Sequence, residues 1–269
     1  MLSTRRSAAT ATLAALAAAS LLAVAGCSGS GAGVRRSHVS EEGPLSTVVN
    51  GKAGRSAPVP ANAAPATTPA PAGLPGVGPK TAAEVPADAT QAVLVTGAGP
   101  DANTSSVTLY VRTDADASWT AAGPAWPAHN ALRGWTAQHH TGDLRSPVGV
   151  FDLTDAGGRL PDPGTRLSYD HAPIGFTVHG TGFHGESLRG AFDYVIAINY
   201  NRKPGTSPRD WTRPLGESRG GGIWLHVDHG GPTQGCVSLP PAVMKTLLRT
   251  LTPAHHPVVV MGDAKSLAQ

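Results

Sequence analysis

The chain changes character near residue 90, and this change limits what it can fold into. Before this point, from Ser28 onward, bulky apolar residues are scarce, and from Pro58 prolines recur every few positions among small residues. Such a segment buries too little apolar surface to offset the entropy lost on ordering, so it is expected to be an extended tether. We therefore predict a linker over residues 27–90 and a folded domain over residues 91–264. Roughly 170 residues are enough for one hydrophobic core.

Short apolar runs in the second part of the chain predict a mainly β fold with one or two short helices. Residues 107–111 alternate between apolar and polar side chains, which is typical of a half-buried strand. Residues 194–199 are apolar on both faces and predict a central strand. Apolar residues at helical spacing over 244–251 predict one helix. Further strands are predicted at 92–96, 118–121, 148–153, 176–179 and 257–261.

Residues 1–26 are typical of an export signal. Arg5 and Arg6 precede an apolar stretch over 13–24 that is too short to span a bilayer. Residues 24–27 (Val-Ala-Gly-Cys) resemble the lipobox of bacterial lipoproteins, in which the cysteine is acylated and becomes the new N-terminus. The alternative is an ordinary secreted protein in which Cys27 is incidental. Acyl chains on Cys27 would anchor an exported protein to the outer face of the cytoplasmic membrane, facing the cell wall.

Charge and cysteine content narrow the functional classes. The formal charge of +3 includes Arg5 and Arg6, so the rest of the chain carries about +1 without a concentrated basic segment. Nucleic acid is therefore not an expected partner. If lipid modifies Cys27, the second cysteine, Cys236, has no intramolecular partner in an oxidising compartment. Such a thiol is either buried and inert or retained for chemistry.

The segment Gly220–Pro240 contains the residues best suited to chemistry. We expect His226 to lie on a strand, and the turn at 230–232 to return the chain like a hairpin, so that Cys236 lies within hydrogen-bond reach of the imidazole. The imidazole would remove the thiol proton and generate a nucleophilic thiolate. Gly235 would allow backbone N–H groups to face a developing oxyanion.

Other histidines are alternatives for the base. His229 is closer to Cys236 in the sequence but lies in a glycine-rich turn, where a solvated side chain is expected. His179 lies far upstream and is predicted to line the pocket or to be structural. Asp228 shares a strand face with His226, but same-face neighbours point in parallel, so a backbone carbonyl is the expected orienting group.

Residues 233–238 (Thr-Gln-Gly-Cys-Val-Ser) resemble the Ser/Thr-x-Gly-Cys-aliphatic core of the L,D-transpeptidase catalytic domain, the YkuD family. Residues 141–151 are similar to the Gly…Thr-Pro-x-Gly-x-Phe segment of that family. Residues 194–201 and 222–227 resemble two strands of one of its branches. The resemblance covers about residues 91–262, with the three parts in the family order.

The resemblance implies a single YkuD-like domain of β-sandwich or barrel type that acts on peptidoglycan stem peptides. Cys236 would attack a carbonyl of the donor peptide, and the acyl group would pass to an amine of the acceptor stem. His226 would be the base, and the amides near Gly235 and Cys236 would form the oxyanion hole. No metal or diffusible cofactor is implied. The residues expected to contact substrate are Thr233, Gln234, Ser238, Trp224 and His179.

The chain departs from the common family pattern on the substrate side. His226 is followed by valine rather than glycine, and its gap to the cysteine is short. Gln234 stands where many members have a second histidine, and Ser238 where many have an arginine or asparagine that would hold a substrate carboxylate. Carboxylate recognition would then move elsewhere, with Arg219 and Arg145 as candidates and surface solvation as the alternative for both.

Three other functions fit the same sequence. Water could resolve the acyl-enzyme, which would make the protein an L,D-carboxypeptidase or endopeptidase. The fold could instead serve as a non-catalytic wall-binding lipoprotein with an inert thiol. Eleven histidines suggest metal binding, but the pairs His139-His140 and His255-His256 lack a ligand framework, because adjacent side chains on a strand diverge.

Overall fold

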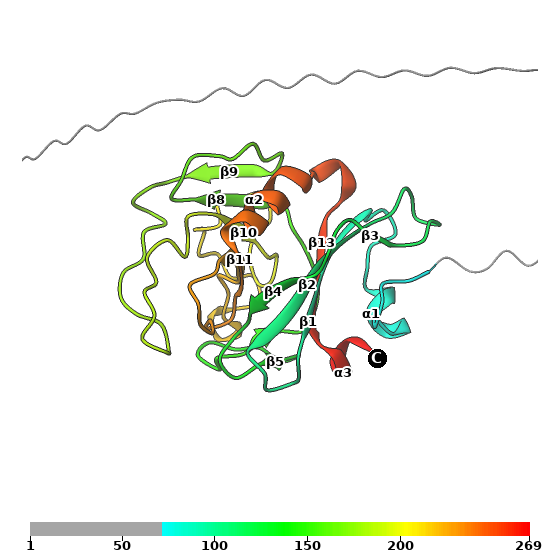
Figure 1. Ribbon diagram of the computed structural model, residues 1–269, viewed down its shortest axis with the longest axis horizontal. Coiled ribbons are helices and arrows are strands. Elements are labelled where there is room, and N and C mark those ends of the chain that lie inside the picture. Colours follow the sequence, from blue (N-terminus) through cyan, green and yellow to red (C-terminus); the bar gives the residue numbers. More distant parts are fainter. Residues whose placement is uncertain (1–71) are drawn as a thin grey trace, which may run out of the picture. The chain divides into compact units, whose positions relative to one another are not determined.

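The computed structural model describes residues 72–269, which form a mainly β domain (Figure 1). The predicted signal segment, Cys27 and the linker up to residue 71 lie outside the described residues. Thirteen strands and three short α-helices make up the described part. The predicted fold class is confirmed. No helix within residues 72–269 has the length and apolar character needed to cross a membrane.

The strands are β1 Gln91–Gly97, β2 Thr104–Val111, β3 Thr120–Ala121, β4 Trp126–His129, β5 Trp135–Thr136, β6 Ser146–Pro147, β7 Gly149–Asp152, β8 Asp155–Gly158, β9 Ser168–His171, β10 Val195–Ala197, β11 Trp224–Val227, β12 Val237–Leu239 and β13 Val258–Asp263. The helices are α1 Pro79–Ala83, α2 Pro241–Thr250 and α3 Ala264–Leu267, with short 3-10 turns η1 Glu217–Arg219 and η2 Pro253–His255.

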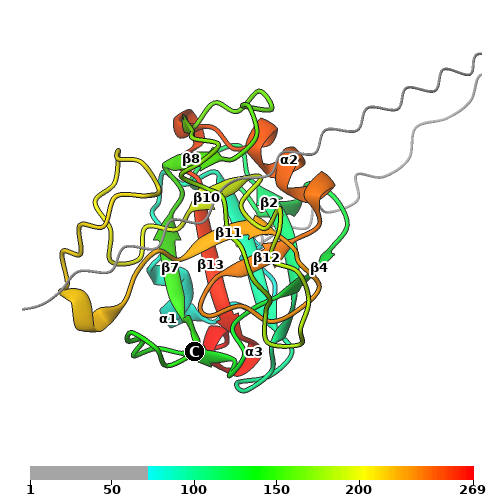
Figure 2. The same ribbon diagram turned by 90° about the vertical axis from the view of Figure 1, so that its left-hand side faces the viewer.

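Eleven strands form one mixed sheet that curls around a core. Its order is β7-β13-β1-β2-β4-β12-β11-β10-β8-β9, with β3 paired to β2, while β5 and β6 pair separately. In Figure 2, β11 crosses in front of β13. Buried side chains from both halves of the sheet, including Leu109 of β2 and Leu225 of β11, belong to one core cluster. The sheet therefore packs against itself in the manner of a β-sandwich.

Helix α2 covers this core and follows the predicted pattern. It begins at Pro241, where the missing N–H and fixed φ of proline are tolerated in a first helical turn. Its buried side chains recur at helical spacing and include Met244, Leu247 and Leu248. The chain leaves the helix at Leu251, whose N–H still bonds to the Leu247 carbonyl. The predicted helix is thus confirmed.

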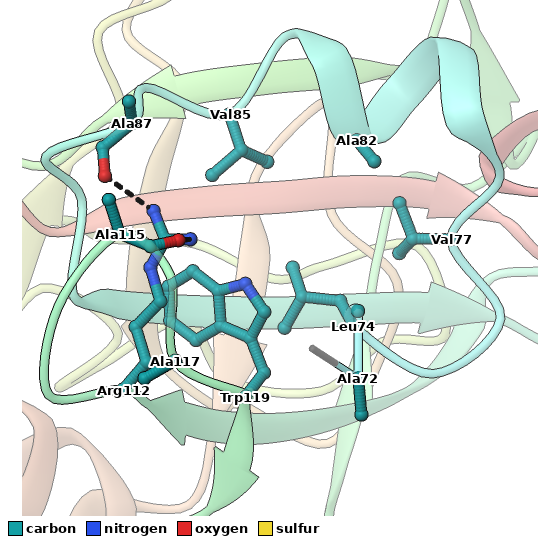
Figure 3. Close-up of a pocket in the computed structure, with 11 residues that line it drawn as sticks. Ala72, Leu74, Val77, Ala82, Val85, Ala87, Arg112, Ala115, Ala117 and Trp119 are labelled. Atoms are coloured by element: carbon teal, nitrogen blue, oxygen red, sulfur yellow. Dashed lines mark hydrogen bonds between the residues drawn. The ribbon is translucent and has the colours of Figure 1, made fainter. Parts of the chain in front are cut away.

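The folded domain extends beyond both predicted boundaries. Leu74 and Ala89 are buried in a second cluster with Leu267 of α3. The Arg112 guanidinium lies 4.5 Å from the Trp119 ring centroid, beside the incoming chain (Figure 3). A start at residue 91 and an end at residue 264 are therefore wrong. A few large side chains hold the segments before residue 91 and after residue 264 to the domain. The sequence gives little sign of the contacts before residue 91, because the residues around them are mostly Gly, Pro and Ala.

The strand predictions hold where alternation or an apolar run was long. Strands β1, β2, β3, β7, β10 and β13 each fall on a predicted segment. The strand expected at 176–179 is wrong, because this segment forms a turn followed by irregular chain. Phe176 is nevertheless buried, and its ring meets Trp224 edge-on at 6.0 Å. The buried Phe176 therefore explains the apolar character that led to the strand prediction.

Candidate active site at Cys236

The strands that carry the candidate site pair in parallel. In the register of β11 and β12, His226 lies opposite Ser238, and Leu225 lies opposite Val237. The predicted hairpin-like return is wrong, because the chain crosses over between these strands. On the way it bonds to another segment, through the Thr233 amide and the Asn130 carbonyl at 3.0 Å. The crossover places Cys236 beside the start of β11.

Cys236 is a free, partly exposed thiol held against the backbone of β11. Its Sγ accepts a hydrogen bond from the Trp224 N–H at 3.4 Å. The thiol also contacts the Gly222 carbonyl oxygen at 3.6 Å, within the reach of a weak S–H donor. Burial raises the pKa of Cys236 to about 11, and the Trp224 N–H opposes this effect. The resting group is therefore a neutral thiol at neutral pH, and its polar partners are backbone groups rather than His226.

His226 is buried as a neutral imidazole. Burial lowers its pKa to about 4, against the effect of the Val227 carbonyl. Nδ1 lies 2.9 Å from the Val227 carbonyl oxygen. Because a carbonyl can only accept, Nδ1 carries the proton and Nε2 keeps its lone pair. Phe192 packs edge-on against the ring at 5.3 Å. The expected orienting group, a backbone carbonyl, is confirmed.

Asp228 contacts side chains of β12 and β4 rather than the imidazole of His226. Its Oδ1 lies 2.9 Å from Nδ1 of His129 and accepts a 2.8 Å hydrogen bond from Ser238 Oγ. Ser238 is 0% exposed, so its hydroxyl cannot reach a substrate from this position. The prediction that Ser238 contacts substrate is therefore corrected: it ties β12 to Asp228.

The turn before Cys236 is fixed by side-chain hydroxyl groups. Thr233 Oγ1 donates to the Cys236 carbonyl at 2.7 Å, and Ser146 Oγ donates to the same oxygen at 3.3 Å. Thr233 is buried, so its role here is to hold the turn rather than to contact substrate. Gln234 is exposed and remains available to a substrate.

Two amide groups in this turn have no hydrogen-bond partner in the described part of the chain. Within residues 72–269, neither the Gly235 nor the Cys236 N–H donates to another backbone group. Unpaired amides beside a nucleophile are the arrangement that stabilises an oxyanion. A Cβ on Gly235 would lie 2.8 Å from Ile223 Cδ1, so a larger residue there would require the Ile223 side chain to shift. The role of Gly235 and Cys236 in an oxyanion hole stays a prediction.

The two rival histidines have different surroundings. His179 is exposed on irregular chain and takes part in no hydrogen bond or ion pair among the described residues. His229 is not solvated as expected. Its side chain is almost completely buried, with Nδ1 3.3 Å from Glu186 Oε1. Its ring is stacked at 5.8 Å on that of His226, so it packs against this imidazole.

His139 is a neighbour of the site that the sequence did not indicate. Its Nδ1 lies 3.1 Å from Asp143 Oδ1, and its Cε1 lies 3.7 Å from the position a Cβ on Gly235 would take. Burial lowers the pKa of His139, while Asp143 opposes this effect. His140 points away, with 67% side-chain exposure. The signal available in the sequence was the i, i+4 spacing of His139 and Asp143, which suits a local imidazole–carboxylate pair.

The two arginines suggested for carboxylate binding make different contacts. Arg145 is already paired, with Nη2 2.8 Å from Asp101 Oδ1 and Nη1 donating to the Trp135 carbonyl at 3.1 Å. Arg219 contributes its carbonyl, which accepts from the Tyr200 hydroxyl at 2.9 Å. Arg145 therefore acts structurally, and Arg219 gives no specific sign of anion binding.

Neither a metal cluster nor a known relative defines the site further. In the described part of the chain, no group of three His, Cys, Asp or Glu side chains is arranged to hold a metal ion. The pocket drawn in Figure 3 is lined by residues 72–87 and 112–119, with none from β11 or β12. Comparison with protein-family models, curated proteins and solved structures gave no match.

Proposed function

We propose that this chain is a cysteine acyltransferase of the L,D-transpeptidase type, acting on peptidoglycan stem peptides. One observation carries the proposal: a partly exposed thiol at Cys236 adjoins two amides, those of Gly235 and Cys236 itself, that have no partner within the described chain. The motif at 233–238 supplies the family resemblance, and the substrate class follows from it. An inert core cysteine would need neither the exposure nor the free amides.

The neutral states of the thiol and imidazole favour proton transfer during attack rather than before it. Cys236 Sγ attacks the carbonyl carbon of the donor while His226 Nε2 takes the thiol proton. The tetrahedral oxyanion faces the free amides of Gly235 and Cys236. Its collapse breaks the C–N bond, and the leaving amine takes the proton from His226. A thioester of the acyl group remains on Cys236.

The second half of the reaction reverses these steps with another amine. The acceptor amine attacks the thioester, gives its proton to His226, and the Cys236 thiolate leaves and is reprotonated. With water as acceptor, the same site hydrolyses the donor. His226 and Cys236 are diagonal neighbours across paired strands, a separation that long side chains can bridge. Catalytic hydrogen bonds are commonly long in free enzymes and shorten when substrate binds.

The proposed location agrees with this chemistry. A lipid on Cys27 and a proline-rich linker over the following residues would hold the domain near the outer face of the membrane, tens of ångströms from the anchor by the length scaling of such linkers. The partners are then donor and acceptor stem peptides of a polymeric wall, together with the membrane. The linker was predicted over residues 27–90, and its last residues, from 72, belong to the described domain.

A β-lactam acyl donor tests the nucleophile. The purified protein, with Cys27→Ser so that one thiol remains, is exposed to a carbapenem and its intact mass is measured. We expect one adduct, located by peptide mapping on Cys236 and lost in Cys236→Ala. An unmodified protein whose Cys236 is also unreactive to thiol reagents would overturn the proposal in favour of a non-catalytic wall-binding role.

A further inference from the structure

The long connection from β10 to β11 folds back over the glycines that precede β11. Figure 2 shows this connection in yellow and gold, looping out beside the sheet. Arg213 Nη2 lies 3.7 Å, and Trp211 Cζ3 4.0 Å, from the position a Cβ on Gly222 would take. A Cβ on Gly221 would lie 2.3 Å from Arg213 Nε. Both glycines also have positive φ, so only glycine allows the arginine to lie so close to this backbone.

Arg213 is partly buried and forms no ion pair with a carboxylate among residues 72–269. Only its Nη1 donates within the described chain, to the carbonyls of Asp210 at 3.2 Å and Thr212 at 3.1 Å. Burial lowers the pKa of Arg213, and nearby Glu217 and Asp210 oppose this effect without forming an ion pair with it. A partly buried guanidinium with unused donors favours an anion at its free edge.

The surroundings of Arg213 hold it open to a ligand. The guanidinium carbon lies 4.9 Å from the Trp211 ring centroid, and that ring is 74% exposed. Nε and Nη2 donate no hydrogen bond among residues 72–269, and these two groups form one edge of the guanidinium fork. A carboxylate can accept from both at once. The pair therefore offers a charged edge backed by an exposed aromatic face.

Gly222 connects this edge to the thiol. The Gly222 carbonyl is the group that Cys236 Sγ contacts at 3.6 Å, so Sγ and Nη2 both border Gly222. His226 lies two residues after Trp224 on β11, and the Trp224 N–H bonds to Cys236 Sγ. Because Gly222 borders both the thiol and Arg213, one end of an acyl donor bound at Cys236 would lie near Arg213.

We propose that Arg213, with Trp211, binds a carboxylate of the acyl donor beside Cys236. The inference rests on the proposed function and names a residue that would select its substrates. It also supplies what the buried Ser238 cannot, a group positioned to recognise a substrate anion. Arg145, already paired with Asp101, is not free for this role.

A pair of thiol reagents of similar size tests the charge selectivity. Iodoacetate carries a carboxylate and iodoacetamide does not, and each alkylates Cys236 with loss of iodide. In a Cys27→Ser background, we compare their rates for the parent protein, Arg213→Gln, Arg213→Lys and Arg166→Gln. Arg166 is an exposed arginine without an ion pair or hydrogen bond in the described part of the chain, and is the matched control.

We expect Arg213→Gln to lower the iodoacetate-to-iodoacetamide rate ratio about tenfold, the effect of losing a charged hydrogen bond, with the iodoacetamide rate unchanged. Arg213→Lys should retain part of the ratio and Arg166→Gln all of it. An unchanged ratio in Arg213→Gln, or an equal fall in both rates, would overturn this inference alone. A Cys236 that reacts with neither reagent would instead overturn the proposed function and this inference with it.

Stem peptides then distinguish two sources of the carboxylate. Donors with a C-terminal carboxylate are compared with donors ending in a carboxamide, using the parent protein and Arg213→Gln. If Arg213 binds the carboxylate of the leaving amino acid, the variant loses the preference for the free acid. If it binds a carboxylate in the acyl part, the preference persists while both donors react more slowly. Equal rates for parent and variant on both donors would contradict either form.

Discussion

Replacing His226 tests whether this residue, the proposed base, is a buried neutral imidazole in the folded protein. The native pKa is about 4, whereas the ordinary value is 6.5. Below pH 6.5 the unfolded chain binds a proton that the native protein does not, so acid favours unfolding until the pH falls through about 4. At pH 5 these values correspond to a loss of about 2 kcal/mol relative to pH 8. Replacing His226 by a residue that cannot titrate should remove this loss of unfolding free energy.

Urea denaturation at pH 8 and pH 5 measures the difference. We compare the purified parent protein with His226→Gln and with His179→Gln, whose exposed side chain makes it the matched control. Between the two pH values, His226→Gln should lose about 2 kcal/mol less unfolding free energy than the parent. His179→Gln should follow the parent. If the unfolding free energy of His226→Gln and of the parent depends on pH in the same way, His226 is not a buried neutral imidazole. Its Nε2 would then not be available to accept a proton.

Three further predictions concern the turn that carries the nucleophile. The rate of Cys236 alkylation by iodoacetamide should still rise above pH 10, because burial raises the thiol pKa to about 11; a plateau near pH 8.5 would contradict this. Gly235→Ala should lower the unfolding free energy by about 1–3 kcal/mol, because its methyl group meets Ile223 at 2.8 Å, whereas Gly123→Ala, with open space around it, should not; equal urea midpoints would refute the contact. Thr233→Val should slow Cys236 acylation in stopped-flow assays by freeing the carbonyl that Thr233 Oγ1 holds, and an unchanged rate would show that the turn needs no such bond.

The sequence predicted well those features that depend on local periodicity. Alternation over 107–111 identified β2, and the apolar spacing over 244–251 identified α2. In both cases one face of the element is buried, and the residues on that face recur at the period of the strand or helix. The same reasoning correctly assigned His226 to a strand and a backbone carbonyl as its orienting group. These features need no knowledge of distant parts of the chain.

Features that depend on long-range packing could not be predicted. Period-two alternation gives the face of a side chain but not the direction of its neighbouring strand, so the parallel pairing of β11 and β12 was missed. Ser238 looked accessible because nothing local shows that Asp228 binds its hydroxyl. Arg213 reaches Gly222 only through the fold of a long connection. Such contacts join residues that the sequence does not relate.

The most direct test of the central claim is the intact mass of the protein during reaction with a defined stem tetrapeptide. The protein carries Cys27→Ser, and the reaction is stopped in acid at short times. We predict an added mass equal to the peptide less its terminal amino acid, located on Cys236, which disappears when an acceptor amine is supplied and a linked product forms. An unmodified protein and an unchanged peptide, with Cys236 still open to alkylation, would contradict the proposed acyltransferase.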